Sequence, residues 1–438
     1  MTAPGGGLLR LEDALARILA GWSPLPVEEV PVDGALGLVL AEPVVASTSL
    51  PPWDNSAMDG FAVRSADVMA ASAEVPVRLR VLGEVAAGHV PPAAVEPGTA
   101  LRITTGAMVP VGADAVVPVE DTDAAFGIAA LPDLVSVRAP APRGANVRRA
   151  GEDVRTGDRL LEPGRLLGPA SIALAAAAGA ARVAVHRRPR VGILSTGDEL
   201  VPAGRPLEPA RIHDSNTPAL LAQARACAAI GTSFGIAADE PASLRERLAG
   251  AIAASDVVVL SGGVSLGAHD HVRQAFEALG DIELWRVAVQ PGKPLAFGRT
   301  TAGRAGDRGD PDRPVALFGL PGNPVSAFVT FELFVRPLLR ALLGDIPASG
   351  TPGARRRVVA VLAEPVTKST ERRAFVRVRV EGDAARPEGL VARLAGGQGS
   401  HVLSALAAAD GLAVIPEGVP GLAAGSPVEV VMLEGEGA

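Results

Sequence analysis

Cysteine and tyrosine are almost missing from this chain of 438 residues, which has one cysteine and no tyrosine. With only Cys227, the chain can form neither an internal disulfide nor a metal site built from several cysteines. Aromatic residues make up only 3% of the sequence. The chain therefore has few of the stacking platforms on which single-stranded nucleic acids bind.

An excess of positive charge and long apolar runs are missing as well. The chain has 41 lysines and arginines against 48 acids, a net charge of −7, so it has no basic footprint for DNA or RNA. Its longest alanine-rich run, residues 172–181, is about half as long as a membrane helix. The N-terminus lacks a basic stretch followed by an apolar core, so no signal peptide is expected. We expect a cytoplasmic protein that binds no nucleic acid and inserts into no membrane.

Glycine and proline, in contrast, are abundant, with 50 and 38 copies spread along the chain. This distribution is typical of many tight turns rather than of disorder. After a helix predicted over residues 8–21, residues 27–166 carry short β-branched runs between turns, the pattern of β structure. We predict an N-terminal region over residues 1–185 with an inserted β-rich subdomain at about 46–150.

Predicted strands and helices alternate from about residue 188 to 343, which implies a parallel, doubly wound sheet. Residues 301–314, TAGRAGDRGDPDRP, are predicted to form a charged hairpin on its surface. Residues 354–436 carry roughly five strands, enough for a small C-terminal β-barrel. The predicted fold class is multidomain α/β, with a central α/β/α domain at 186–345 between β-rich flanks.

Three glycine-bearing loops follow predicted strands of the central domain: STGDE, SGGVS and PGN. The carboxyl ends of parallel strands meet at one sheet edge, where glycines and helix N-termini favour anions. Any one loop alone is as easily a simple turn, but three at one edge predict a phosphate or oxyanion site. The residues expected to contact the anion are Ser195, Thr196, Gly197, Ser261, Gly262, Gly263, Ser265, Pro321, Gly322 and Asn323.

Carboxylates accompany these loops. Glu199 and Asp270 fall at the same edge, and Asp239 ends another strand-like segment. Because carboxylates repel an oxyanion, a cation such as Mg²⁺ is needed to bridge them to a phosphate. An isolated loop acid is more often solvated or a helix cap, so that interpretation stays open for each acid. His269 and His271 flank Asp270, but they reach one zinc ion only through an unusual turn.

The segment WDNSAMDGFAV, residues 53–63, is dense in acids and amides. Asp54 and Asn55 are typical of an Asx turn that satisfies its own backbone. Asp59 in the same segment fits a ligand or metal loop equally well. Composition leaves both interpretations open.

Nine motifs occur in order along the chain: DNSAMDGFAV, RITTGAMVP, GANVRRAGED, ILSTGDEL, HDSN, LSGGVSLGAHDH, QPGKPLAFG, LPGNPVSA and GGQGSHVL. Together they resemble the molybdopterin molybdenumtransferase family of MoeA and the gephyrin E domain. The resemblance implies a homodimer whose cleft lies between the central domain of one subunit and the N-terminal part of the other. It also implies that adenylylated molybdopterin and molybdate are substrates, that AMP leaves, and that Mg²⁺ is the cofactor.

The family's functional acids carry over to four positions, each with a catalytic and Mg²⁺-binding role implied by the resemblance. They are Asp59, Glu199, Asp239 and Asp270. Asp270 is our first choice for the catalytic acid. Further substrate-binding positions that the resemblance implies are Thr105, Asp153, Arg286, Lys293, Arg377 and Ser400.

Two positions depart from the well-studied bacterial members, which have lysines where this chain has Arg286 and Gln290. Arg286 keeps the charge in a different shape, whereas Gln290 loses it. The departure also fits a divergent paralogue that acts mainly as a dimeric interaction scaffold. A third interpretation is the preceding adenylyltransferase step, but those enzymes lack the flanking β domains. An adenylyltransferase or another protein is a possible partner.

Overall fold

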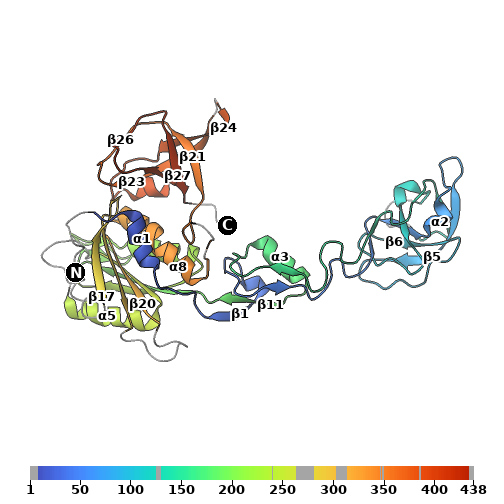
Figure 1. Cartoon of the computed structure of the whole chain (residues 1–438), viewed down its shortest axis with the longest axis horizontal. Helices are drawn as coiled ribbons and strands as arrows, with labels where there is room; N and C mark the ends of the chain where they lie inside the picture. The colour runs from blue at the N-terminus through green and yellow to red at the C-terminus, as the bar shows by residue number, and fades with distance from the viewer. Residues whose placement is uncertain are drawn as a thin grey trace.

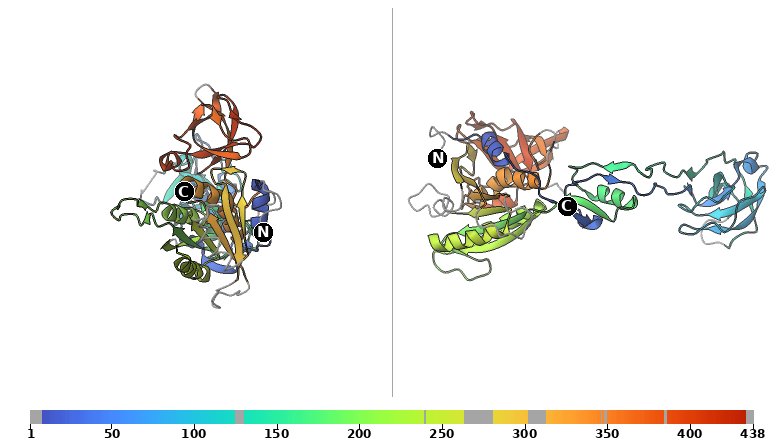
Figure 2. Two further views of the ribbon diagram at one scale, coloured as in Figure 1. Left: turned by 90° about the vertical axis from the view of Figure 1, so that its left-hand side faces the viewer. Right: turned by 60° about the horizontal axis from the view of Figure 1, so that its bottom comes forward.

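The chain folds into an elongated molecule with a β-rich lobe at one end and a larger body at the other (Figures 1 and 2). A narrow stalk connects them. The chain runs along it twice, once toward the lobe and once back to the body. The computed structural model describes residues 8–124, 130–238, 240–262, 281–301, 313–345, 347, 350–383 and 386–433. No helix in these ranges is long and apolar enough to cross a membrane.

The β-rich lobe contains a five-stranded sheet in the order β7-β4-β6-β5-β8. Alternating side chains on these strands bury an apolar core that includes Phe61, Val63 and Leu79. The lobe elements are β3 (Asn55–Ser56), β4 (Gly60–Val63), α2 (Ser65–Val68), β5 (Val77–Val85), β6 (Thr99–Ile103), β7 (Ala115–Pro118), η2 (Val119–Asp121), β8 (Leu134–Val137) and β9 (Val147–Arg148). Antiparallel pairing of β3 with β9 brings the entry and exit of the lobe together.

Two short antiparallel ladders and one helix form the stalk and its base. β2 pairs with β10, and β1 pairs with β11. Their bounds are β1 (Val27–Pro31), η1 (Val32–Gly34), β2 (Val44–Val45), β10 (Arg159–Leu161), α3 (Pro169–Ala177) and β11 (Arg182–His186). Each ladder joins segments more than a hundred residues apart, so the lobe is an insertion within the N-terminal region.

The first helix, α1 (Leu11–Leu19), lies on the body rather than on the β-rich region (Figure 1). Its Ala14 and Ile18 are buried in the core of the central domain. Just before the helix, the Leu9 N–H donates to the Arg286 carbonyl at 2.8 Å. Leu9 and helix α1 thus pack against a domain that begins much later in the chain. The domain limits predicted from the sequence stay predictions.

The central domain has a six-stranded sheet in the order β15-β12-β16-β20-β19-β17. The first four strands are parallel, as predicted, but β19 runs antiparallel to both β20 and β17. The prediction of a wholly parallel sheet was therefore wrong at this edge. A short connection joins β17 to β19, whereas parallel neighbours need a crossover of about a dozen residues or more. The strands are β12 (Arg190–Thr196), β15 (Ile230–Ala237), β16 (Val257–Ser261), β17 (Asp281–Arg286), β19 (Pro294–Thr300) and β20 (Val315–Leu320).

Helices cover both faces of this sheet, which confirms the doubly wound architecture. On strand β16, Val257 and Val259 join the core under α1, α4 and α8. Val258 and Leu260 face the opposite core under α5. Figure 1 shows α5 on one side of the sheet, with α1 and α8 on the other. The helices are α4 (Asn216–Ala226), α5 (Pro241–Ala254), α7 (Pro324–Thr330), the π-helical η3 (Phe331–Val335) and α8 (Arg336–Leu342).

The C-terminal segment forms the predicted small β-barrel, and the five predicted strands are present. β23 pairs with both β24 and β25, which closes the sheet. A parallel pairing of β18 with β23 joins the barrel to the central domain. The bounds are β18 (Val289–Gln290), β21 (Arg357–Leu362), β22 (Val366–Thr367), β23 (Arg373–Asp383), β24 (Arg386–Leu394), α9 (Leu403–Ala407), β25 (Gly411–Ile415), β26 (Gly421–Leu422) and β27 (Pro427–Met432). The predicted surface hairpin at 301–314 falls largely outside the described residues.

Candidate active site

The three glycine-bearing loops meet at one edge of the central sheet. Strands β12, β16 and β20 end side by side, with Ser195 opposite Ser261 and Ser261 opposite Leu320. The Gly262 N–H donates to the Leu320 carbonyl at 3.1 Å. A Cβ on Gly262 would lie 2.6 Å from the carbonyl oxygen of Thr196, so only glycine fits here. The described residues therefore show that these loops start at one sheet edge, as predicted.

An asparagine that the sequence analysis did not single out ties these loops together. The Asn216 side-chain amide donates to the Ser261 hydroxyl at 2.7 Å and to the Gly322 carbonyl at 2.8 Å. Asn216 opens α4, so a helix start fixes the positions of two neighbouring loops. Gly322 and Asn323 are exposed at this edge, and Pro321 is buried beneath them.

A second group missed from the sequence lies beside it. The buried Asp214 carboxylate accepts the N–H groups of Asn216 and Thr217 and, at 2.6 Å, the Thr217 hydroxyl. The Thr217 hydroxyl lies 2.9 Å from the Ser195 hydroxyl. In the HDSN motif Asp214 stands one position before Ser215, the N-cap residue of α4, where a carboxylate can accept the first N–H groups of the helix. That signal was present in the sequence, but only the fold shows that the cap reaches Ser195.

Two oxygen-bearing side chains at this edge, those of Thr196 and Glu199, make no side-chain hydrogen bond among the described residues. The Thr196 hydroxyl is buried and has no hydrogen-bond partner among the described residues. The exposed Glu199 carboxylate lies over Gly197, where a Cβ would be 2.5 Å from it. A cavity of about 720 Å³ opens beside them, and its charged lining residues are two arginines, Arg211 and Arg247, and two acids, Asp198 and Asp214. An anionic ligand bridged by a cation fits this combination of groups.

Several predicted site residues lie outside the described part of the chain: Gly263, Ser265, Asp239 and Asp270. Within the described part, no three His, Cys, Asp or Glu side chains are grouped closely enough to hold a metal ion. The predicted set of four acids is therefore not tested as a metal site.

Asp59 lies in the β-rich lobe, far along the molecule from the central sheet edge (Figure 1). Its exposed carboxylate accepts the Thr105 N–H at 2.6 Å and the Thr105 hydroxyl at 2.9 Å. These bonds, the backbone one first, hold the pKa of Asp59 below its ordinary value. At the next position, a Cβ on Gly60 would lie 1.9 Å from the Val117 carbonyl oxygen, so glycine is required.

Asp54 has a different role from the one predicted. Its carboxylate binds the Arg149 guanidinium at 2.6 Å and the Ala150 N–H at 2.8 Å. The prediction of an Asx turn on the local backbone was wrong for Asp54, because both partners lie on the segment of chain that leads back from the lobe to the body. Asp153, on the same segment, is exposed, and its N–H donates to the Leu50 carbonyl.

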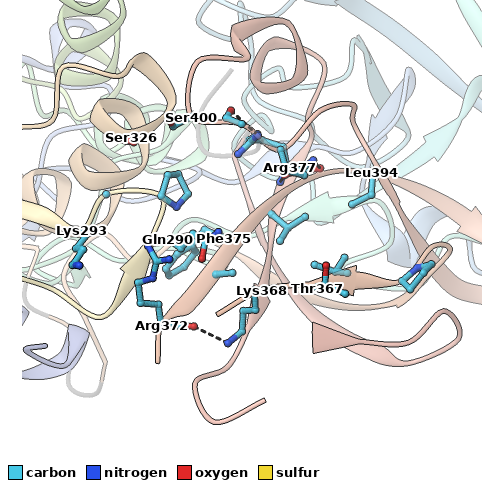
Figure 3. A pocket seen from close by; sticks show the side chains of 18 of the residues that line it. Gln290, Lys293, Ser326, Thr367, Lys368, Arg372, Phe375, Arg377, Leu394 and Ser400 are labelled. Atoms are coloured by element: carbon cyan, nitrogen blue, oxygen red, sulfur yellow. Dashed lines mark hydrogen bonds between the residues drawn. The ribbon is translucent and has the colours of Figure 1, made fainter. Parts of the chain in front are cut away.

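A second cavity, of about 600 Å³, lies between the central domain and the barrel (Figure 3). The charged side chains that line it are all cations: Lys293, Lys368, Arg372 and Arg377. The described residues that line it include no carboxylate. Such a cavity favours an anion, since four positive groups face it without a compensating acid.

Arg377 is the most buried of the four cations, with 1% of its surface exposed. Its guanidinium donates to the carbonyls of Gly397 and Gly399 at 2.9 and 3.1 Å. Its Nε is buried without a partner among the described residues, and burial lowers the pKa of the guanidinium. A buried charge with an unused donor is costly unless a ligand or water satisfies it.

The 397–400 loop links this cavity to the sheet edge. The carbonyl of Ser400 accepts the Val325 N–H at 3.1 Å, at the start of the helix that follows the PGN loop. Ser400 and Lys293, two of the predicted substrate-binding positions, both line the cavity. Arg286, in contrast, is exposed at the end of β17 and is not among the residues that line this cavity.

Known proteins match the chain along its whole length. Three family models match in succession: the MoeA N-terminal region (domain I and II) at residues 9–179, a probable molybdopterin binding domain at 192–341, and the MoeA C-terminal region (domain IV) at 359–433. Molybdopterin molybdenumtransferase 2 of Mycobacterium tuberculosis is 41% identical over 407 residues, 92% of this chain and 94% of that protein. The chain belongs to the MoeA family of molybdopterin molybdenumtransferases. The resemblance inferred from the nine motifs is confirmed.

Further MoeA relatives also match nearly the whole chain. The molybdopterin molybdenumtransferase of Haemophilus influenzae is 34% identical over 427 residues, 97% of this chain and 98% of that protein. The crystal structure of a MoeA protein of molybdopterin biosynthesis from Pyrococcus horikoshii is similar, with a TM-score of 0.75 and 35% identity. That similarity covers 98% of this chain and all of the other. MoeA membership makes this chain a transferase with a central domain of the molybdopterin-binding type.

The contribution of the Thr105 hydroxyl to the low pKa of Asp59 can be tested by substitution. Replacing Thr105 by valine removes the hydroxyl bond but keeps the N–H bond, so the pKa of Asp59 should rise part of the way to its ordinary value. Because the native pKa is depressed, the stability from this contact is present above the unfolded-state pKa. It is lost as the pH falls from the unfolded-state pKa through the folded-state pKa, and in Thr105→Val that loss should be smaller and should end at a higher pH.

Carboxyl-carbon NMR titration of Asp59 measures this shift directly. Thr105→Ser keeps a hydroxyl and should titrate like the native chain. An unchanged Asp59 titration in Thr105→Val would show that the hydroxyl contributes nothing to the low pKa.

Proposed function

We propose that this chain inserts molybdenum from molybdate into adenylylated molybdopterin and releases AMP, with Mg²⁺ as cofactor, in the cytoplasm. The observation that carries the proposal is the cavity lined by four cations and no described carboxylate, joined to the glycine-rich sheet edge. One substrate is a small oxyanion and the other carries a phosphoanhydride. The chain offers adjacent sites suited to each.

The cationic cavity is the proposed molybdate site. Arg377, Lys293 and Ser400 line it, and the unused Nε of Arg377 is a charge-assisted donor for an oxyanion. The sheet edge is the proposed site of the adenylylated pterin, where Gly262 and Gly322 allow backbone groups to approach the phosphates. The Ser400–Val325 contact holds the two sites at a fixed spacing.

The four predicted acids are the proposed Mg²⁺ ligands. The two that the structure describes, Asp59 and Glu199, have the oxygen donors that this ion prefers. The Glu199 carboxylate makes no side-chain hydrogen bond among the described residues, so its hard oxygens are available. Asp59, with its depressed pKa, stays ionised near neutral pH. Asp239 and Asp270 complete the proposed set. Bound Mg²⁺ would neutralise the phosphoanhydride, and the residues of the chain hold both substrates in place.

Asp59 and Glu199 lie in different lobes of one chain, so a shared site needs a second copy (Figure 1). We therefore propose a homodimer in which Asp59 of one subunit serves the sheet edge of the other. An adenylyltransferase that supplies the substrate, or another protein, is a proposed further partner. Positioning and charge neutralisation then account for most of the rate enhancement, as in phosphoryl transfer generally.

Turnover tests the proposal directly. The purified full-length chain, given adenylylated molybdopterin, molybdate and Mg²⁺, should release AMP and form molybdenum cofactor. Omitting molybdate or Mg²⁺ should each lower the rate. A folded dimer that releases no AMP with all three present would overturn the proposal and favour the scaffold alternative.

A further inference from the structure

Arg372 and Gln290 lie near each other, beside the short ladder that joins the central domain to the barrel. In the parallel pairing of β18 with β23, Val289 is opposite Arg373 and Gln290 is opposite Ala374. Arg372 lies two positions before Ala374, immediately before β23 begins at Arg373. Figure 3 shows both side chains at one end of the cationic cavity, with Arg372 extending toward Gln290.

Neither side chain is satisfied within the described residues. The Oε1 atom of Gln290 is buried and has no hydrogen-bond partner there. The half-buried guanidinium of Arg372 has no ion-pair or hydrogen-bond partner in the described residues either. On the central-domain wall Gln290 contributes no charge and Lys293 contributes one, while Lys368, Arg372 and Arg377 come from the barrel.

Lys368 fixes the segment that carries Arg372. Its ammonium donates to the Ser369 carbonyl at 3.0 Å and to the Arg372 carbonyl at 2.7 Å. Burial, with a smaller contribution from Arg372, lowers the pKa of Lys368 against the opposing effect of Glu417. Lys368 thus holds the backbone that presents Arg372.

We propose that Arg372, positioned by Lys368, binds the tetrahedral oxyanion substrate and supplies the positive charge that Gln290 lacks. This inference rests on the proposed function, because that function makes the oxyanion molybdate. The planar guanidinium donates to two oxygens of one anion at once, which an ammonium at position 290 does not do. Arg372 is the oxyanion-binding residue, and Lys368 is a positioning residue.

Isothermal titration of the full chain with molybdate alone tests this without turnover. Arg372→Gln should weaken molybdate binding by about tenfold to a hundredfold, the range for a lost hydrogen bond to a charged group. Adding Gln290→Lys to that variant should restore most of the affinity, since the charge returns on the opposite strand. The matched control is Arg356→Gln, which removes an exposed arginine of the same barrel outside the cavity and should bind like the native chain.

Lys368→Met should weaken binding in the native background but add little in the Arg372→Gln background, since a positioning residue acts through its target. Equal effects in both backgrounds would overturn its positioning role. Native-like binding by Arg372→Gln, or failure of Gln290→Lys to rescue it, would overturn the assignment of Arg372. Molybdate binding that depends on Arg372 in a chain that releases no AMP would refute the proposed function and leave this inference standing.

Discussion

Asp59→Asn chains and Glu199→Gln chains, each inactive alone, should regain activity when they are mixed and allowed to exchange subunits. Each substitution removes a charge at the place where the adenylate is proposed to bind, so each alone should lower turnover at least about a hundredfold. In a heterodimer with shared clefts, one cleft combines the intact Asp59 of one chain with the intact Glu199 of the other. The second cleft carries both substitutions.

The size of the recovery distinguishes the two arrangements. Random exchange at equal concentrations makes half the dimers heterodimers, so about a quarter of all clefts should be intact in a two-fold symmetric dimer. Activity should then reach about that fraction of the native rate. If both acids served the same chain, every cleft would keep one substitution and no activity would return. Native mass spectrometry shows whether heterodimers have formed.

Arg377→Met should lower the efficiency with which molybdate is used by about a hundredfold to a thousandfold, the effect of removing one preorganised donor. The substitution removes the buried guanidinium and its unused Nε from the cavity. It also removes one donor from each of the carbonyls of Gly397 and Gly399, although the Gly399 carbonyl keeps the Val402 N–H. Since this loop contacts the start of α7 through Ser400, the spacing between the two proposed sites should also change.

The rate of AMP release against molybdate concentration measures this effect. Arg377→Lys keeps the charge but not the guanidinium fork, so it should fall between the native chain and Arg377→Met. Arg379→Met, on the same strand but exposed and outside the cavity, is the matched control. A native response of Arg377→Met to molybdate would exclude Arg377 from the oxyanion site, provided that thermal unfolding shows it folded.

Several features of the site could be predicted from local sequence alone. The loops after β12, β16 and β20 meet at one edge because parallel strands between helices must end together. The five barrel strands could be predicted because alternation and turn residues are local signals. The antiparallel edge formed by β17 and β19 was missed, since strand direction depends on the connection and on the partner strand.

The sequence by itself determined the family, the layered α/β core with its β-rich flanks, and the glycine loops on which an anion site depends. Only the tertiary structure decided which of these residues face one another. It separated Asp59 from Glu199, gave Asp54 a partner in Arg149, and placed Arg372 and Gln290 in the lining of one cavity. The physical reason is the distance along the chain over which each signal acts. Periodicity and turn chemistry depend on a few neighbouring residues. A pocket between domains, in contrast, is formed by packing between segments far apart in the chain.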